Sequence, residues 1–309
     1  MSTKEPFFSI IIPTFNRANL LPKAISSVLS QTFDDWELII VDDGSTDNTE
    51  AVVCKIEDPR IRYIYQSNAE RSAARNNGIE HAHGSYICFL DSDDYYTNER
   101  LELLHQEITK RNCPIAMFYT DILTDRSGKF EKLHFDYGKY ENIYENILRN
   151  TIGNPQVSIS RDILSEFKFD IRFHIGEDVE LWLRVAQKYP LIYIENQYTF
   201  VVVEHEDRSV NVMRYNSGVE QLRLYRYIFD NNHSGKNLTS ELKSFLVSRA
   251  FQSIAKYNIH QHNRIAAIVA LIKAIKSDRH SVLLKFRINI LIKLMSFYPF
   301  EKLKMLLYY

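Results

Sequence analysis

The sequence predicts an α/β protein with a mostly parallel β-sheet flanked by helices, followed by an all-helical C-terminal region. The first 120 residues contain five short runs rich in β-branched and aromatic residues, and segments with helical spacing of apolar residues separate them. Strands that alternate with helices in this way form βαβ units and a parallel sheet. From about Val210 onward only helical patterns occur. We therefore expect two domains, residues 1–209 and 210–309.

Three of the five expected strands are almost entirely apolar, which is typical of strands buried on both faces. The spacing of apolar residues predicts helices between them. The expected strands are Phe8–Ile12, Glu37–Val41, Arg62–Tyr65, Tyr86–Leu90 and Ile115–Tyr119, and the expected helices span 20–29, 47–56, 72–82 and 99–110.

The rest of the first domain has a weaker pattern. Residues 121–175 are polar, and we expect them to be irregular. A broad apolar stripe predicts a helix over 177–188, and two apolar runs predict strands at Leu191–Ile194 and Tyr198–Val203.

The composition is that of a globular protein. Of 309 residues, 45% are hydrophobic and 25% are charged, which excludes a disordered or collagen-like chain. Three scattered cysteines show neither a disulfide framework nor paired metal-ligand spacing, which favours a reducing compartment. Residues 1–6 lack a signal-peptide pattern, and no apolar run reaches the ~18 residues of a spanning helix. We therefore expect a cytoplasmic protein.

Charge is distributed unevenly along the chain. The net charge is −1, but residues 264–309 contain nine Lys or Arg against two Asp or Glu. Such a basic segment could meet an anionic surface. A uniformly basic footprint is absent, so we expect no nucleic-acid partner.

The densest acidic cluster, Asp91-Ser92-Asp93-Asp94, directly follows an expected buried strand. Ligands of open α/β sheets bind at the carboxyl ends of the strands. Adjacent carboxylates repel one another, and a hard divalent cation such as Mg²⁺ or Mn²⁺ would offset that cost. The alternative is a solvated turn before a helix, where Asp is favoured in any case.

Three more polar groups follow expected strands of the same sheet. Asp42 and Asp43 could accept hydrogen bonds from a nucleobase or ribose, and Phe15, after Pro13-Thr14, could provide a stacking face. Arg71 and Arg75 would share one face of a helix and suit a diphosphate. Each group alone also fits a turn, a cap or a core position. Together they would meet at one sheet edge, where a nucleotide diphosphate and a metal would fit.

Two further residues are candidates for chemistry. Asp178, which follows Glu177 at the start of an expected helix, could be a helix cap or a general base. His205, after a valine run, could bind a phosphate or a metal, or be an ordinary polar residue.

As an ordered set, these motifs resemble family 2 glycosyltransferases, which have the Rossmann-like GT-A fold. The resemblance covers about residues 7–205. Its segments are Ser9–Arg17, Ser26–Thr32, Val41–Asp47, Ala74–Ile79, Phe89–Asp94 and Gly176–Arg184.

The resemblance implies an inverting enzyme that uses a UDP-sugar and Mn²⁺ or Mg²⁺ to glycosylate a glycan or lipid-linked acceptor in cell-surface polysaccharide biosynthesis. Asp178 would be the catalytic base, and Asp93, Asp91 and His205 would be metal ligands. The UDP-sugar would contact Pro13, Thr14, Phe15, Asp43, Asn68, Arg75, Asp91, Ser92, Asp93 and Glu177.

This chain departs from the family pattern in two places. Ala69-Glu70 stands where a glycine often follows Asn68, next to the expected donor sugar. The Gln-x-x-Arg-Trp signature of processive synthases is absent, so we expect a non-processive enzyme.

Two other functions remain open at this point. A sugar-1-phosphate nucleotidyltransferase would have a similar fold, but it carries a glycine-rich basic loop where this chain has Pro13–Arg17. The other is a non-catalytic relative that only binds nucleotide or glycan. Loss of Asp93 or Asp178 would favour this alternative, and both residues are present.

The C-terminal segment 281–309 mixes apolar and basic residues. Helices of this kind can lie on an anionic membrane surface, here the inner face of the plasma membrane. The alternative is a helical bundle that packs on the catalytic domain or on a second subunit of a homo-oligomer.

Overall fold

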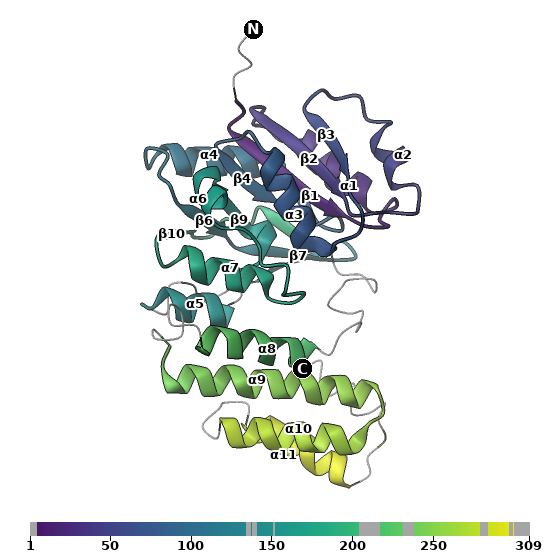
Figure 1. The fold of residues 1–309 in the computed structure, drawn as a ribbon, viewed down its shortest axis with the longest axis vertical. Coiled ribbons are helices and arrows are strands. Elements are labelled where there is room, and N and C mark those ends of the chain that lie inside the picture. Colours follow the sequence, from purple (N-terminus) through teal and green to yellow (C-terminus); the bar gives the residue numbers. More distant parts are fainter. Residues whose placement is uncertain are drawn as a thin grey trace. The chain divides into compact units, whose positions relative to one another are not determined.

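The central element is a seven-stranded, mostly parallel sheet, as expected (Figure 1). The computed structural model describes residues 5–133, 137, 141–150, 152–203, 217–230, 238–278, 284–296 and 299, except the side chain of Phe286. The strand order is β10-β6-β9-β4-β1-β2-β3. The strands are β1 (Phe8–Thr14), β2 (Trp36–Asp42), β3 (Ile61–Tyr65), β4 (Tyr86–Phe89), β6 (Met117–Thr120), β9 (Val157–Ser160) and β10 (Leu191–Ile194).

The parallel half of the sheet follows from the apolar runs. Strand β1 lies between β2 and β4 and is parallel to both, and β3 continues the parallel order beyond β2. Ile10, Ile12, Leu38 and Ile40 are fully buried in the core. The carboxyl ends of β1, β2 and β4 therefore open on the same edge of the sheet.

Strand pairing on the β2 side continues past Pro13, although proline has no N–H group to donate. Strand β1 continues through Thr14, whose carbonyl accepts a hydrogen bond from Asp43 N at 2.8 Å. Ile11 O accepts from Leu90 N on the opposite side. Because alternate residues point to alternate sides, the Pro13 nitrogen faces the β4 side, where pairing ends at Ile11.

The expectation that residues 121–175 are irregular is wrong. Strand β9 lies between β4 and β6 and is antiparallel to both. Its sequence Val-Ser-Ile-Ser alternates in polarity, yet all four residues are buried, so the pattern hides a central strand. The same region contains β7 (Ile122–Arg126), β8 (Lys129–Leu133), α5 (Ile143–Asn150), the 3₁₀ turn η1 (Asn154–Gln156) and α6 (Arg161–Glu166).

A second, four-stranded sheet has the order β5-β11-β7-β8. Strand β5 (Tyr95–Tyr96) follows the acidic loop, and β11 (Phe200–Val203) is the later part of the run expected at Tyr198–Val203. Strand β11 pairs with β5 and β7. Because β5 pairs with β11, this sheet holds the segment that directly follows the acidic loop.

The helices between the strands lie where the apolar spacing predicts them. They are α1 (Leu21–Leu29), α2 (Thr49–Val53), α3 (Glu70–His81), α4 (Arg100–Thr109) and α7 (Glu177–Val185). Helix α3 packs on β1 and β2. Gly78 allows this contact, because a Cβ there would lie 2.5 Å from the Ile11 side chain. The close packing fixes the position of the arginines on α3.

The chain divides into two compact units, Met1–Arg208 and Ser209–Tyr309. The described part of the second unit consists of helices α8 (Ser217–Asp230), α9 (Ser240–His260), α10 (Arg264–Ser277) and α11 (Leu284–Met295). Buried residues of α9, α10 and α11 form one apolar cluster, which includes Ala255, Ala267, Leu271, Ile290 and Leu294. Among the described residues, no helix combines the length and apolar character needed to cross a bilayer.

Candidate functional site

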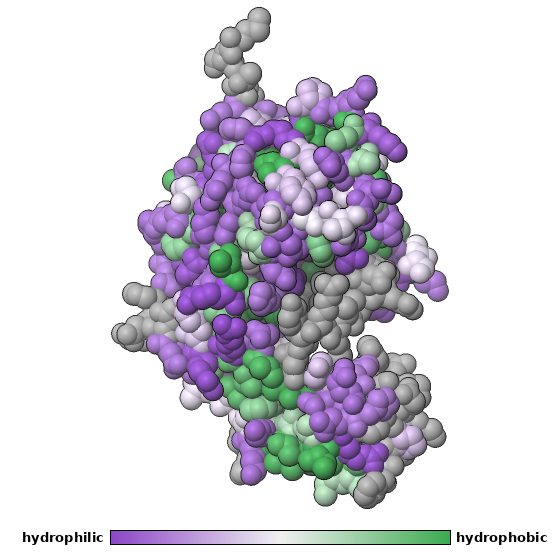
Figure 2. All heavy atoms as spheres, turned by 45° about the vertical axis from the view of Figure 1, so that its right-hand side comes forward, coloured by the Kyte–Doolittle hydropathy of each residue, from purple (hydrophilic) through white to green (hydrophobic). Residues whose placement is uncertain are grey.

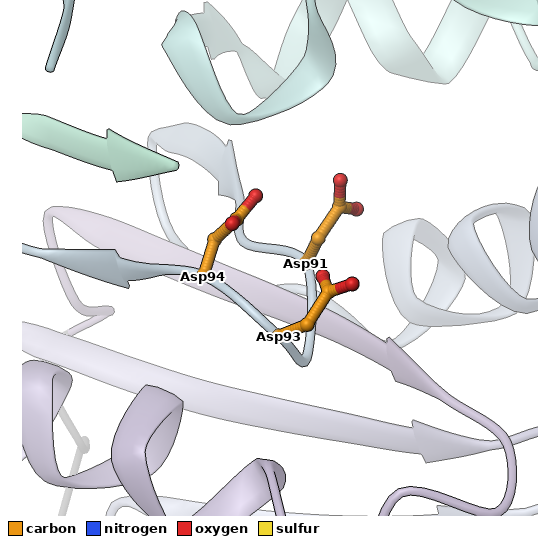
Figure 3. A group of neighbouring side chains, drawn as sticks. All are labelled: Asp91, Asp93 and Asp94. Carbon is orange, nitrogen blue, oxygen red and sulfur yellow. The ribbon is translucent and has the colours of Figure 1, made fainter. Parts of the chain in front are cut away.

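Three carboxylates cluster in the loop that follows β4. One oxygen each of Asp91, Asp93 and Asp94 lie within 4.8 Å of one another, and Figure 3 shows the side chains projecting from this loop. Asp91 and Asp93 are half-buried, whereas Asp94 is buried and its Oδ1 accepts a hydrogen bond from Val203 N at 2.8 Å. The bond to β11 holds the loop in place. Asp91 and Asp93 remain the more accessible pair.

Arg75 connects this loop to helix α7. Its Nη2 donates to Asp91 Oδ1 at 3.0 Å, and its Nη1 donates to Glu177 Oε1 at 2.9 Å. The side chain is 4% exposed. Burial disfavours its charge, but the charges of Asp91 and Glu177 outweigh that cost and hold the pKa of Arg75 above its ordinary value. The guanidinium therefore fixes two carboxylates from segments far apart in the chain.

Arg71, one turn earlier on α3, supports the same contact. Its Nε lies 3.8 Å from Glu177 Oε1, and its Nη2 donates to His174 O at 2.9 Å. Residues four apart lie on one helical face. Both arginines therefore lie on the same face of α3, as expected, and both approach Glu177 at the start of α7.

Asp178 lies half-buried in the first turn of α7, next to Glu177. Its Oδ1 accepts a hydrogen bond from Val179 N at 2.7 Å. Burial and the neighbouring charge of Glu177 raise the pKa of Asp178 to about 7, although Arg75 and Arg71 oppose this shift. A carboxylate with this pKa can accept a proton near neutral pH.

A second polar group surrounds Asp43, at the end of β2. Its Oδ1 accepts hydrogen bonds from Gln66 Nε2 at 2.7 Å and from Ala69 N at 2.9 Å, and its carbonyl accepts from Asn68 Nδ2 at 2.9 Å. Gly44 has a φ of +84°, and a Cβ there would lie 2.8 Å from Asn68 N. Glycine therefore permits the loop after β3 to close over Asp43.

The residues at the end of β1 lie beside this loop. Thr14 is buried, Pro13 is half-buried and Phe15 is 38% exposed. The following Asn16 has a φ of +52°, and its Oδ1 accepts a hydrogen bond from Thr46 N at 2.8 Å. The exposed ring of Phe15 is thus available to a ligand at the same edge as Asp43.

Helix α3 joins the two groups. Asn77 Nδ2 donates to Gln66 Oε1 at 2.7 Å, so a chain of contacts runs from Asp43 to the helix that carries Arg75. The sequence-based assignment omitted Gln66, Asn77 and Asp94. Two of these residues have a signal in the sequence: Gln66 is a polar residue directly after the strand β3, and Asp94 is the third carboxylate of the acidic cluster.

The predicted site residues differ in their exposure to solvent. Ser92 and Glu177 are buried, and Asn68 is exposed. The terminal nitrogens of Arg75 contact protein carboxylates. His205 lies outside the residues that the structure describes.

Residues 9–167 match the glycosyl transferase family 2 sequence profile. An uncharacterized glycosyltransferase of Rickettsia felis is 35% identical over 183 residues, which is 58% of this chain and 30% of the relative. The chain thus spans about a third of that relative's length. The UDP-Glc:alpha-D-GlcNAc-diphosphoundecaprenol beta-1,3-glucosyltransferase WfgD of Escherichia coli is 35% identical over 183 residues, covering 58% of this chain and 69% of the relative.

The fold resembles that of solved GT-A glycosyltransferases. The structure of S. aureus TarS 1-349 in complex with UDP-GlcNAc aligns with a TM-score of 0.64 and 16% identity, over 97% of this chain and 90% of that TarS 1-349 chain. The expected GT-A fold, with its mostly parallel sheet and helical C-terminal region, is confirmed. The sequence match and the fold agree, and the chain belongs to glycosyl transferase family 2.

Proposed function

We propose that this chain is an inverting, non-processive glycosyltransferase that uses a divalent metal to move a sugar from a UDP-sugar to a hydroxyl group of a glycan or lipid-linked acceptor. The observation that carries the proposal is the buried connection from Asp91 through Arg75 to Glu177, which is adjacent in sequence to Asp178. It ties a cluster of carboxylates that would hold a cation to a carboxylate that would accept a proton.

The donor set of the acidic loop fits Mg²⁺ or Mn²⁺. Both ions prefer oxygen ligands, and three carboxylate oxygens lie within 4.8 Å of one another. Asp93 and Asp91 would hold the ion, with His205 as a further candidate from the sequence. When bound, such an ion supplies positive charge that stabilises the departing diphosphate.

Asp43 would recognise the uracil base. Both hydrogen bonds to its side chain end on Oδ1, so Oδ2 can accept from a base N–H group. Phe15 and Pro13 would contact the base, and Thr14, Asn68 and Ser92 would line the rest of the donor site. The two donors from Gln66 and Ala69 keep the carboxylate in one orientation, which lowers the entropy lost on binding.

Asp178 would act as the general base. It would take the proton of the acceptor hydroxyl while that oxygen forms a bond to the anomeric carbon and the bond to the diphosphate oxygen breaks. Attack from the face opposite the diphosphate inverts the anomeric centre. Arg75 and Glu177 would hold this helix end next to the donor.

The name of the Escherichia coli relative suggests a first donor and acceptor to test. It names UDP-Glc as donor and a diphosphoundecaprenol-linked sugar as acceptor, with a β-1,3 product. UDP-glucose has an α-linked diphosphate, so a β-linked product requires inversion. We propose that this chain acts in cell-surface polysaccharide biosynthesis on an acceptor of the same lipid-linked class.

The test measures UDP release from a panel of UDP-sugars, with added Mn²⁺ or Mg²⁺ and with EDTA. We expect release with at least one donor, which rises with an acceptor and stops with EDTA. Absence of release with every donor and metal would contradict the proposal. Release that EDTA leaves unchanged would contradict only the metal dependence.

A further inference from the structure

Helices α10 and α11 each carry an exposed aliphatic stripe. On α10 it consists of Ile265, Val269 and Ile272, and on α11 of Ile288, Ile292 and Met295. In both helices the spacing is i, i+4 and i+7, which places the three side chains on one helical face. Figure 2 shows hydrophobic residues gathered on the surface of the helical unit. We call these six residues the α10–α11 face.

The core of the helical unit does not require this face. The inward residues of the same helices, including Ala267, Leu271, Ile290 and Leu294, already form the shared cluster with α9. Ile265 is 78% exposed and Ile292 is 57% exposed. Helices α10 and α11 pack against each other, and exposed apolar patches on soluble proteins mark interaction sites.

Positive charge accompanies the face. Lys273, Lys276 and Lys285 are exposed on the same two helices, and residues 264–309 carry a net charge of +7. Lysine is depleted at protein–protein interfaces, where aromatic side chains are enriched. Aliphatic side chains with lysines beside them are instead typical of a helix that lies in the interface of an anionic bilayer, where the ammonium groups reach the headgroups.

We propose that the α10–α11 face is a docking surface for an anionic phospholipid bilayer. The isoleucines enter the boundary between headgroups and acyl chains, and the lysines contact lipid phosphates. The surface includes α10 and therefore extends beyond the segment 281–309 that the sequence indicates. Docking on a bilayer would place the enzyme of the proposed function at a membrane, where a lipid-linked acceptor is held. The docking itself does not depend on the transfer chemistry.

The test is flotation of the full chain with vesicles of phosphatidylcholine that contain phosphatidylglycerol, and with phosphatidylcholine alone. We expect binding only to the anionic vesicles and loss of binding at high salt. The substitutions Ile265→Glu and Ile292→Glu together should lower the bound fraction at least about tenfold, because two apolar side chains no longer enter the bilayer. The matched control is Ile115→Glu, at a residue of the first unit that is 48% exposed, and it should bind as the unaltered chain does.

A second variant tests the charge without changing the apolar residues. Lys273→Gln with Lys285→Gln should reduce flotation severalfold, since each lysine near an anionic surface contributes to binding. Circular dichroism checks that each variant is folded.

Several outcomes would overturn the inference. One is that the unaltered chain does not float with anionic vesicles. Another is that the isoleucine variant floats as well as the unaltered chain. The third is that the Ile115→Glu control loses as much binding as the isoleucine variant. If light scattering instead shows a dimer that the isoleucine variant abolishes, the face is an interface between copies. UDP release, measured without vesicles, should be the same in the isoleucine variant, so failure of the proposed function and failure of docking give different results.

Discussion

Arg75 and Glu177 form a buried ion pair, with Nη1 and Oε1 2.9 Å apart, between residues 102 positions apart in the sequence. The second terminal nitrogen of the same guanidinium contacts Asp91. The pair thus joins the end of the parallel sheet to the start of α7. We expect Arg75 to act mainly by positioning the carboxylates around it.

Removal of this guanidinium should destabilise the fold. Arg75→Met removes the ion-pair partner of Asp91 and leaves the buried Glu177 with the more distant Arg71, whose Nε lies 3.8 Å from its Oε1. The free energy of unfolding should therefore fall by about 3–5 kcal/mol. Combining it with Glu177→Leu should recover part of that loss, because the buried charge that has lost its close partner is then removed. Denaturant unfolding of the single and double variants measures both effects.

Lys188→Met is the control for an exposed ion pair, since Lys188 contacts Glu166 at the surface. It should change the free energy of unfolding by at most about 1 kcal/mol. A loss for Arg75→Met no larger than that of the control would show that the buried pair does not support the fold.

Asp178 should set the acidic limb of the pH profile. The base must be deprotonated and its pKa is raised to about 7, so kcat/KM should fall as the pH drops below about 7. Asp178→Asn should leave UDP binding nearly intact and lower transfer by about 10²–10⁴-fold. Calorimetric titration and a transfer assay separate the two effects, and an equal loss of both would reject the assignment as base.

The same pKa predicts how stability depends on pH. An acid whose pKa is raised on folding binds more protons in the folded than in the unfolded state, so its contribution to stability falls as the pH rises from about 4 to about 7. Asp178→Asn lacks this ionisation. The Tm of the variant relative to the unaltered chain should therefore be higher at pH 8 than at pH 5, and a difference that does not change with pH would contradict the raised pKa.

Asp93→Ala should weaken the binding of UDP in the presence of Mn²⁺ and have little effect on its binding in EDTA. The reason is that the substitution removes one of the more accessible carboxylates of the cluster. Asp58→Ala is the control, since Asp58 pairs with Arg60 outside the cluster. Unchanged Mn²⁺-dependent affinity in the Asp93 variant would exclude Asp93 as a ligand.

Glu70 adopts a left-handed backbone conformation, with a φ of +70°, at the start of α3. This is the stretch where the resemblance leads us to expect glycine, and the backbone of Glu70 has a conformation that suits glycine. Glu70→Gly should raise the free energy of unfolding by about 1 kcal/mol, because glycine has no Cβ to clash in this region. Glu70→Ala removes the charge but keeps the strain, so it should give no such gain. An equal effect of the two substitutions would show that charge, and not the backbone, is responsible.

Most of the sheet could be predicted from the sequence, and the exceptions have a physical cause. The apolar runs of β1, β2 and β4 are long enough to indicate buried parallel strands. Strand β9 was missed because Ser158 and Ser160 interrupt its apolar pattern, although both are buried between neighbouring strands. Burial of small hydroxyl side chains depends on tertiary contacts that no local pattern reveals.

The sequence indicated candidate residues for the site, but it did not indicate how they contact one another. The order of motifs indicated the residues Asp43, Asp91 and Asp178. The sequence could not indicate that Arg75 contacts protein carboxylates with both terminal nitrogens, because its two partners lie on different segments. The role of Gln66 as a support for Asp43 likewise depends on the register of β2 and β3.

The central claim is that the carboxylates after β4 hold a divalent cation next to a UDP diphosphate. A crystal structure of the chain with UDP and Mn²⁺, with the manganese located by its anomalous scattering, tests this most directly. We predict a manganese peak at about 2.1 Å from an Asp93 carboxylate oxygen and in contact with the diphosphate, with uracil beside Asp43. A nucleotide bound elsewhere, or an Asp93 side chain turned away from the metal, would contradict the account.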